Sequence, residues 1–183
     1  MKHNPSKNKI LLVKIIMLGD MAVGKTALIQ RFVKQTFSRS YKSTMGLDIS
    51  LKEVKVYDSL IRLQLWDLAG QVTFKSIRPK FYNGTRGAIL VYDATRPATF
   101  HDLQYWLQEL KAHVPVRIPF IVIGNKIDLQ DLVLVTEEDE KFWASESKTL
   151  GYYRTSAKTG ENVEAAFEAL AVEIFNEIEK FGN

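Results

Sequence analysis

Apolar residues are arranged along this chain in two alternating patterns, one typical of strands and one typical of helices. Short runs rich in Val, Ile and Leu predict buried strands, and runs that alternate apolar with polar positions predict half-buried ones. The predicted strands are residues 10–18, 49–56, 60–65, 87–92, 120–124 and 152–155. This pattern predicts a sheet of six strands.

Apolar residues three or four positions apart predict helices between these strands. The spacing is clear over residues 25–35, 98–113 and 162–181. A further helix is expected after Thr136, because a Thr followed by acidic residues is typical of a helix N-terminus. We expect the acidic run at 137–140 to be solvated and not to bind metal.

The alternation of strands and helices predicts an α/β fold, with a mostly parallel sheet flanked by about five helices. In such sheets, ligands bind at the carboxyl ends of the strands. Residues 1–9 are polar and predict a flexible N-terminal segment, while residues 10–183 contain no linker and predict one domain. Trp106 and Trp143 lie in helical patterns, and we expect both to serve in packing.

Composition and charge exclude several classes of function. The formal net charge is +4, but no run of Lys and Arg reaches five residues, so we expect no nucleic-acid binding. The absence of cysteine excludes disulfides, thiolate metal sites and a cysteine nucleophile within this sequence, and the last residues given, 180–183, hold no prenylation cysteine. No apolar run is long enough to span a membrane, which takes about 20 residues. We therefore expect no membrane anchor in this chain.

The clearest chemical motif follows the first predicted strand. Residues 19–26 read GDMAVGKT and match the pattern G-x-x-x-x-G-K-[ST]. Its glycines let successive backbone N–H groups point at phosphate oxygens, and the helix that follows adds its positive end. We expect Lys25 to reach the β- and γ-phosphates and the Thr26 hydroxyl to hold Mg²⁺. The residues expected at the phosphates are Ala22, Val23, Gly24, Lys25, Thr26 and Ala27.

A second motif predicts which base is bound. Residues 125–128 read NKID and follow a buried strand. Asp128 can accept two hydrogen bonds from guanine, and adenine cannot supply that pair. Each such charge-assisted bond contributes roughly 1.5–3 kcal/mol, which favours guanine by about 10²–10⁴-fold. Asn125 can join this loop to the phosphate loop, and the stem of Lys126 can lie along the base.

Further candidate residues lie elsewhere in the chain. The segment 156–158 can place a backbone N–H at the guanine carbonyl; its residues are Ser156, Ala157 and Lys158.

Asp67 lies just after the predicted strand 60–65 and can hold Mg²⁺ through a water, while Gly70 can offer its N–H to a γ-phosphate. Gln71 can orient an attacking water, and Thr44 can complete the Mg²⁺ shell.

These motifs, in this order and spacing, resemble those of the Ras-like small GTPases, and the resemblance spans nearly the whole chain. Segments 41–48, 66–71 and 90–95 are most similar to the Rab family. The resemblance implies the P-loop NTPase fold known as the G domain. It also implies that Phe37 packs edge-on against guanine and that Tyr41 closes over the phosphates.

The resemblance further implies a monomeric molecular switch that binds GTP or GDP with Mg²⁺ and hydrolyses GTP slowly. Effectors, exchange factors and GTPase-activating proteins (GAPs) would bind through the loops at residues 37–46 and 69–82. A Rab-like role in membrane traffic or related signalling follows. The expected location is the cytoplasm, with membrane association if a lipidated tail is missing from this sequence.

The chain departs from the family pattern at several positions, and the departure at Met21 leaves an alternative open. Met21 stands where the family usually has a small residue facing the γ-phosphate, and Val72-Thr73 replaces a usual Glu-Arg pair. Met21 could crowd Gln71 or an incoming arginine. The alternative function is therefore a hydrolysis-deficient docking module that stays bound to GTP. A third interpretation, an ATP-using P-loop enzyme, conflicts with the NKID motif.

Overall fold

The computed structural model describes residues 11–37, 44, 46–70 and 76–181 of the chain. Within these residues, six strands form one sheet with the spatial order β2-β3-β1-β4-β5-β6. The β2–β3 pair is antiparallel and all other neighbours are parallel, so the predicted mostly parallel sheet is confirmed. The strands are β1 (Leu11–Leu18), β2 (Leu47–Val56), β3 (Ser59–Leu68), β4 (Gly87–Asp93), β5 (Phe120–Asn125) and β6 (Gly151–Thr155).

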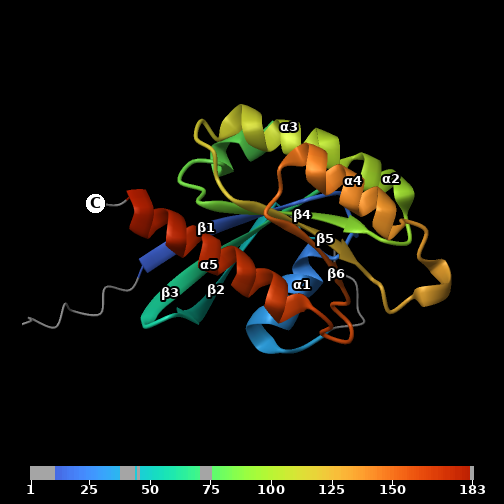
Figure 1. Cartoon of the computed structure of the whole chain (residues 1–183), viewed down its shortest axis with the longest axis horizontal. Coiled ribbons are helices and arrows are strands. Elements are labelled where there is room, and N and C mark those ends of the chain that lie inside the picture. Colours follow the sequence, from blue (N-terminus) through green and yellow to red (C-terminus); the bar gives the residue numbers. More distant parts are fainter. Residues whose placement is uncertain (1–10, 38–43, 45, 71–75, 182–183) are drawn as a thin grey trace, which may run out of the picture.

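Helices cover both faces of the sheet (Figure 1). Helices α1 and α5 lie on one face, and α2, α3 and α4 lie on the other. The α-helices in the described part of the chain are α1 (Lys25–Lys34), α2 (Pro97–His101), α3 (Leu103–His113), α4 (Glu137–Ser147) and α5 (Val163–Phe181). None of the helices in these residues is long and apolar enough to cross a bilayer.

Alternating side chains of the central strand β1 reach the two cores. Val13 and Ile15 pack towards α1 and α5, where the rings of Phe32 and Phe167 stack 4.3 Å apart. Ile16 belongs to the opposite core, beneath α3. Because both faces of β1 are buried, its sequence is continuously apolar apart from Lys14, as expected for a strand covered on both sides.

The prediction of one continuous helix over residues 98–113 is wrong about its continuity. The structure divides this stretch into α2 and α3, with Asp102 between them. Asp102 keeps helical torsions, with φ −71° and ψ −9°, and the N–H of Trp106 still donates to its carbonyl at 3.1 Å. The interruption is therefore a local bend. The sequence does not predict it, because Asp102 is a residue that a continuous helix also accepts.

The start of α4 confirms one prediction and corrects another. Thr136 caps the helix, because its hydroxyl accepts from the N–H of Asp139 at 3.2 Å. Glu140 is not solvated, since only 2% of it is exposed. Its carboxylate accepts a hydrogen bond from the Tyr92 hydroxyl and lies 3.6 Å from the guanidinium of Arg154. Helix periodicity turns this fourth acid inward, towards the sheet.

The register of the sheet brings the polar strand ends together. Asp93 at the end of β4 lies beside Asn125 at the end of β5, and Asn125 lies beside Thr155 at the end of β6. On the other side of the sheet centre, Met17 of β1 is the neighbour of Asp67 in β3. The carboxyl ends of the parallel strands thus form one polar edge, where ligands of open α/β sheets bind.

Candidate functional site

The loop between β1 and α1 folds around the amine of Lys25. Its Nζ donates to the carbonyls of Gly19 at 2.7 Å and Asp20 at 2.8 Å. Three loop residues have positive φ: Gly19 with 140°, Ala22 with 64° and Gly24 with 106°. A Cβ on Gly24 would lie only 2.1 Å from Nδ2 of Asn125, so no other residue fits there.

Lys25 is a buried cation with incomplete compensation. The residue is only 6% exposed. Burial lowers the pKa of Lys25 to about 8, although the neighbouring Asp67 and Asp20 oppose the shift. It begins α1, whose first N–H groups and dipole also favour an anion. This end of the site is therefore chemically suited to phosphate.

Two hydroxyls and one carboxylate meet beside Lys25. The Thr26 hydroxyl donates to Oδ2 of Asp67 and lies 2.8 Å from the hydroxyl of Thr44. Thr44 also donates to Oδ2 of Asp67 at 3.3 Å. The other carboxylate oxygen, Oδ1, is buried and has no hydrogen-bond partner among the described residues. Burial raises the pKa of Asp67 despite its hydrogen bonds to Thr26 and Thr44.

This oxygen cluster fits Mg²⁺, which prefers hard oxygen ligands and retains several waters. The unpartnered Oδ1 of Asp67 can accept from such a water, and the hydroxyls of Thr26 and Thr44 can bind the ion. In the part of the chain that the structure describes, no three His, Cys, Asp or Glu side chains gather as a metal site. A Mg²⁺ site here would consequently rest on hydroxyls and one carboxylate.

Gly70 lies against the backbone of the phosphate loop. A Cβ at this position would lie 2.5 Å from the carbonyl carbon of Asp20 and 2.7 Å from the nitrogen of Met21. The chain after β3 is thereby held close to the loop. Gln71 and Tyr41, two of the predicted site residues, lie outside the described residues.

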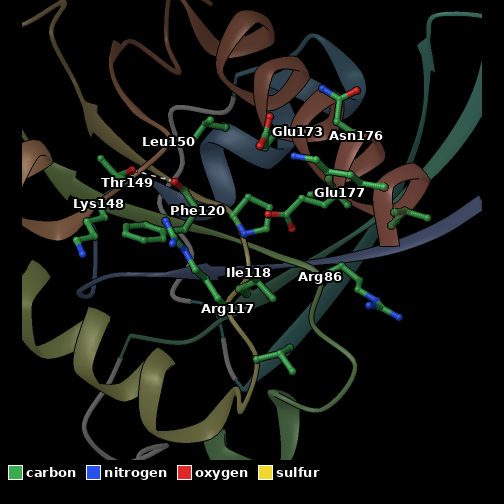
Figure 2. Close-up of a pocket in the computed structure, with 15 residues that line it drawn as sticks. Arg86, Arg117, Ile118, Phe120, Lys148, Thr149, Leu150, Glu173, Asn176 and Glu177 are labelled. Atoms are coloured by element: carbon green, nitrogen blue, oxygen red, sulfur yellow. Dashed lines mark hydrogen bonds between the residues drawn. The ribbon is translucent and has the colours of Figure 1, made fainter. Parts of the chain in front are cut away.

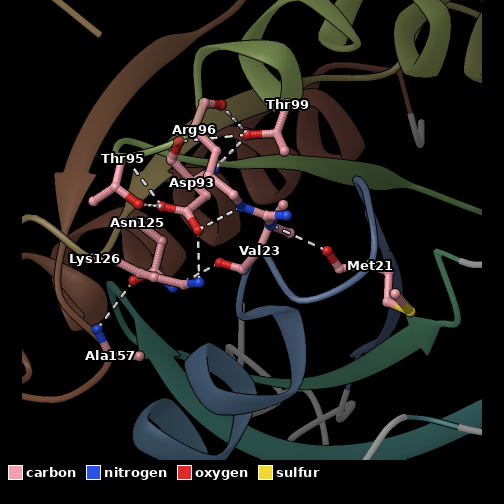
Figure 3. Close-up of polar contacts among 9 residues, drawn as sticks. All are labelled: Met21, Val23, Asp93, Thr95, Arg96, Thr99, Asn125, Lys126 and Ala157. Atoms are coloured by element: carbon pink, nitrogen blue, oxygen red, sulfur yellow. Dashed lines mark hydrogen bonds and ion pairs between the residues drawn. The ribbon is translucent and has the colours of Figure 1, made fainter. Parts of the chain in front are cut away.

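Asn125 joins three loops. Its amide Nδ2 donates to the carbonyl of Val23 at 2.9 Å, and its Oδ1 accepts from the N–H of Ala157 at 3.1 Å. The residue is 1% exposed, so these bonds are shielded from water. The structure thus brings the predicted base loops and the phosphate loop together (Figure 3). It also commits the N–H of Ala157, one candidate donor to guanine, to Asn125.

The carboxylate of Asp128 is held by the loop at 156–158. Ser156 donates to its Oδ1 at 2.7 Å, and Nζ of Lys158 lies 3.2 Å from its Oδ2. Burial opposes ionisation, but the hydrogen bonds from Ser156 and Lys158 hold the pKa of Asp128 below its ordinary value. Arg31 of α1 supports the same loop by donating to the carbonyl of Ala157 at 2.8 Å. Phe37, also predicted at the base, is 37% exposed.

Sequence reasoning assigned Trp106 to packing, and the structure adds a polar role. The residue is 3% exposed, which confirms its packing, but its indole N–H also donates to Oδ1 of Asp20 at 2.8 Å. The guanidinium of Arg78 lies 4.4 Å from the centre of the indole and pairs with Glu109 at 2.9 Å. These contacts connect the chain after residue 75 to the phosphate loop through α3.

Asp93 and Arg96 were also missed. The carboxylate of Asp93 accepts from Nζ of Lys126 at 2.6 Å and from Nε of Arg96 at 2.9 Å (Figure 3). An aspartate at the end of a strand next to the NKID strand was a usable signal for Asp93. No local pattern pointed to Arg96.

A large groove lies at the opposite edge of the sheet and contains none of the motif residues. It has a volume of about 970 Å³ and is bordered by the starts of β4, β5 and β6 and by the end of α5 (Figure 2). Its charged residues are mixed in sign, including Arg86, Arg117, Lys148, Glu173 and Glu177. Because both signs are present, the lining does not favour an anion over a cation as a ligand.

Comparison with known proteins identifies the class. The family model "Ras family" matches residues 14–176. The chain is 42% identical over 170 residues to Ras-related protein Rab7 of Drosophila melanogaster, covering 91% of this chain and 82% of the relative. It is 42% identical over 173 residues to Ras-related protein RABG3f of Arabidopsis thaliana, covering 91% and 84%. Ras-related protein Rab7 of Pisum sativum gives 42% over 173 residues, covering 91% and 84%.

The chain belongs to the Ras family of small GTPases, which have the P-loop NTPase fold. Within that family it is Rab-like. The resemblance inferred from the motifs and the predicted fold class are both confirmed.

Proposed function

We propose that this small GTPase binds GTP and GDP with Mg²⁺, hydrolyses GTP slowly, and changes its protein contacts with the bound nucleotide. The observation that carries the proposal is the link made by Asn125 between Val23 of the phosphate loop and Ala157 of the base loop. A base site and a phosphate site fixed to each other in this way suit one ligand that spans both.

At the base end, Asp128 is the residue that selects guanine. Its low pKa keeps it an ionised acceptor for N1–H and the exocyclic amine. The stem of Lys126 would lie along one face of the ring and Phe37 against its edge. Because the N–H of Ala157 is bonded to Asn125, the N–H of the adjacent Lys158 would meet the guanine carbonyl, supported by Ser156.

At the phosphate end, Lys25 would exchange its carbonyl contacts for β- and γ-phosphate oxygens. The N–H groups from Ala22 to Ala27 would surround the phosphates, Gly70 would donate to the γ-phosphate, and Tyr41 would close over it. Mg²⁺, when bound, neutralises charge that develops on the phosphate oxygens. Thr26 and Thr44 would hold the ion, with Asp67 acting through a water.

Hydrolysis would use Gln71 to orient a water in line with the γ-phosphate. Loss of that phosphate removes contacts to Thr44 and Gly70 and releases the loops at 37–46 and 69–82. Effectors, exchange factors and GAPs would bind those loops. A GAP that supplies an arginine is worth roughly 10³–10⁵ in rate. The protein would act as a monomer, either in the cytoplasm or on a membrane through a lipidated tail.

Met21 supports the second candidate, a GTP-bound docking module without hydrolysis. Its side chain is 51% exposed at the tip of the phosphate loop, where a large group can obstruct Gln71 or a partner's arginine. Met21→Gly would separate the two candidates. If Met21 suppresses hydrolysis, the glycine variant converts GTP faster than the natural chain does.

The main experiment loads the purified protein with GTP and Mg²⁺, with ATP as the control, and follows the bound nucleotide by chromatography. Slow conversion of GTP to GDP without retention of ATP is the expected result. Retained but unhydrolysed GTP would favour the docking module. Equal retention of ATP and GTP would contradict the base-site assignment.

A further inference from the structure

Arg96 connects two loops that the motifs describe separately. It is the residue before α2, and its Nε donates to Oδ2 of Asp93 at 2.9 Å. Its terminal NH2 group donates to the main-chain carbonyl of Met21 at 3.1 Å, across 75 residues of sequence. Figure 3 shows the guanidinium between Asp93 and the phosphate loop. One planar side chain therefore bonds both a carboxylate and the loop backbone.

Asp93 provides a rigid anchor for this arginine. It is 1% exposed, and its Oδ1 accepts from the N–H of Thr95 at 3.0 Å and from the Thr95 hydroxyl at 2.7 Å. Its Oδ2 also accepts from Nζ of Lys126 at 2.6 Å. The backbone of Arg96 is fixed as well, because its carbonyl accepts from the Thr99 hydroxyl at 2.8 Å. Both carboxylate oxygens are thus committed before a ligand arrives.

The carbonyl of Met21 belongs to the same peptide unit as the N–H of Ala22. All peptide bonds in the described chain are trans, so this C=O and N–H point in opposite directions. A carbonyl held outwards by Arg96 therefore turns the N–H of Ala22 towards the inside of the loop. Asn125 has the same effect two residues further along, because it holds the carbonyl of Val23 and so orients the N–H of Gly24.

The backbone at this point needs such a restraint. Ala22 has φ 64°, a left-handed conformation that costs a residue with a Cβ roughly 1–2 kcal/mol. Without glycine in the loop at 20–23, hydrogen bonds from outside are required to hold the strained peptide unit in place. Arg96 supplies one of them.

We propose that Arg96 is a positioning residue that fixes the Met21–Ala22 peptide for phosphate binding and connects it, through Asp93, to Lys126 of the base loop. This inference rests on the proposed function, because the ligand must be a nucleoside phosphate that spans both loops. Arg96 should therefore slow the release of nucleotide, because the nucleotide can leave only when the phosphate loop and the base loop move apart. A lysine cannot replace the arginine, because one ammonium cannot bond both partners with the geometry of a planar fork.

The test measures the dissociation rate of a fluorescent GDP analogue from the whole 183-residue chain with Mg²⁺. Arg96→Ala should release GDP about tenfold faster, from the loss of one charge-assisted hydrogen bond to the loop. Arg96→Lys should resemble the alanine variant. Arg117→Ala is the matched control, an exposed arginine at the opposite edge of the sheet, and should leave the rate unchanged.

A spectroscopic readout separates positioning from general stability. In the GDP-bound protein, amide hydrogen exchange of Ala22 should become about tenfold faster in Arg96→Ala, while that of Gly24, fixed by Asn125, should not change. Unchanged GDP release, or equal acceleration by Arg117→Ala, would overturn the proposal. Equal loss of protection at Ala22 and Gly24 would also overturn it. Failure of the natural chain to retain GDP would instead refute the proposed function itself.

Discussion

The base half and the phosphate half of the site are built in opposite ways. In the base half, the chain supplies its own partners: Asp128 is bonded by Ser156 and Lys158, and Asn125 by Ala157. In the phosphate half, charged groups lack full compensation. Lys25 is buried among carbonyls, and one oxygen of Asp67 has no partner among the described residues.

Two carboxylates show the difference most clearly. Burial opposes ionisation of both, but hydrogen bonds dominate at Asp128 and its pKa is lowered, whereas burial dominates at Asp67 and its pKa is raised. The ionised carboxylate of Asp128 already has hydrogen-bond donors around it, so it is pre-organised to accept hydrogen bonds from a neutral base. A group whose charge is poorly satisfied gains most from a cation. On the proposed function, the base half would therefore be ready before binding, and the phosphate half would be completed by its ligand.

Lys25→Ala tests this difference with the largest expected effect. GDP affinity should fall by about 10³-fold, because removing one partner of a buried charge pair costs roughly 3–5 kcal/mol. The nucleotide-free protein should lose little stability, since the buried amine is unfavourably placed there. Calorimetric titration and urea unfolding measure the two quantities. A large loss of stability without ligand would show that Lys25 is structural.

Asp128→Asn tests the base half. It should weaken GDP binding by about 10²–10³-fold, through the loss of charge-assisted hydrogen bonds, and favour xanthosine diphosphate. Competition between the two nucleotides measures the change. The Mg²⁺ requirement should stay as it is, because that belongs to the other half. An unaltered order of affinities would contradict the role of Asp128.

Gln71→Leu should separate binding from chemistry within the phosphate half. We expect single-turnover GTP hydrolysis to slow by about 10²-fold, from misplacement of the attacking water, with GDP affinity unchanged. Rapid-quench measurement of phosphate release reports the rate. Hydrolysis at the natural rate would exclude Gln71 from the reaction.

Trp106→Phe has the smallest expected effect. The ring stays against Arg78, but the hydrogen bond to Asp20 is lost, so nucleotide release should accelerate by about fivefold, equivalent to about 1 kcal/mol. Trp143→Phe is the control, since Trp143 packs in the same core cluster. Equal effects of the two variants would show that packing alone is responsible.

The placement of the candidate site could be predicted because its determinants are local. The glycine loop at 19–24, the lysine after it and the NKID motif each follow a buried strand, and parallel strands place their carboxyl ends at one edge. The strand and helix positions were accurate to within a few residues for the same reason. The bend at Asp102 and the burial of Glu140 were not predicted. Both residues are compatible with a regular, exposed helix, so their identity indicates neither feature.

The sequence by itself determined the order of strands and helices, the motifs at the strand ends and membership of the Ras-like class, because hydrophobic periodicity and glycine conformation act over short range. Only the tertiary structure decided that Arg96 reaches Met21 across 75 residues and that Trp106 reaches Asp20 across 86. These contacts depend on how α2 and α3 pack against the sheet. Packing fixes the direction of each side chain, and no spacing in the sequence encodes it.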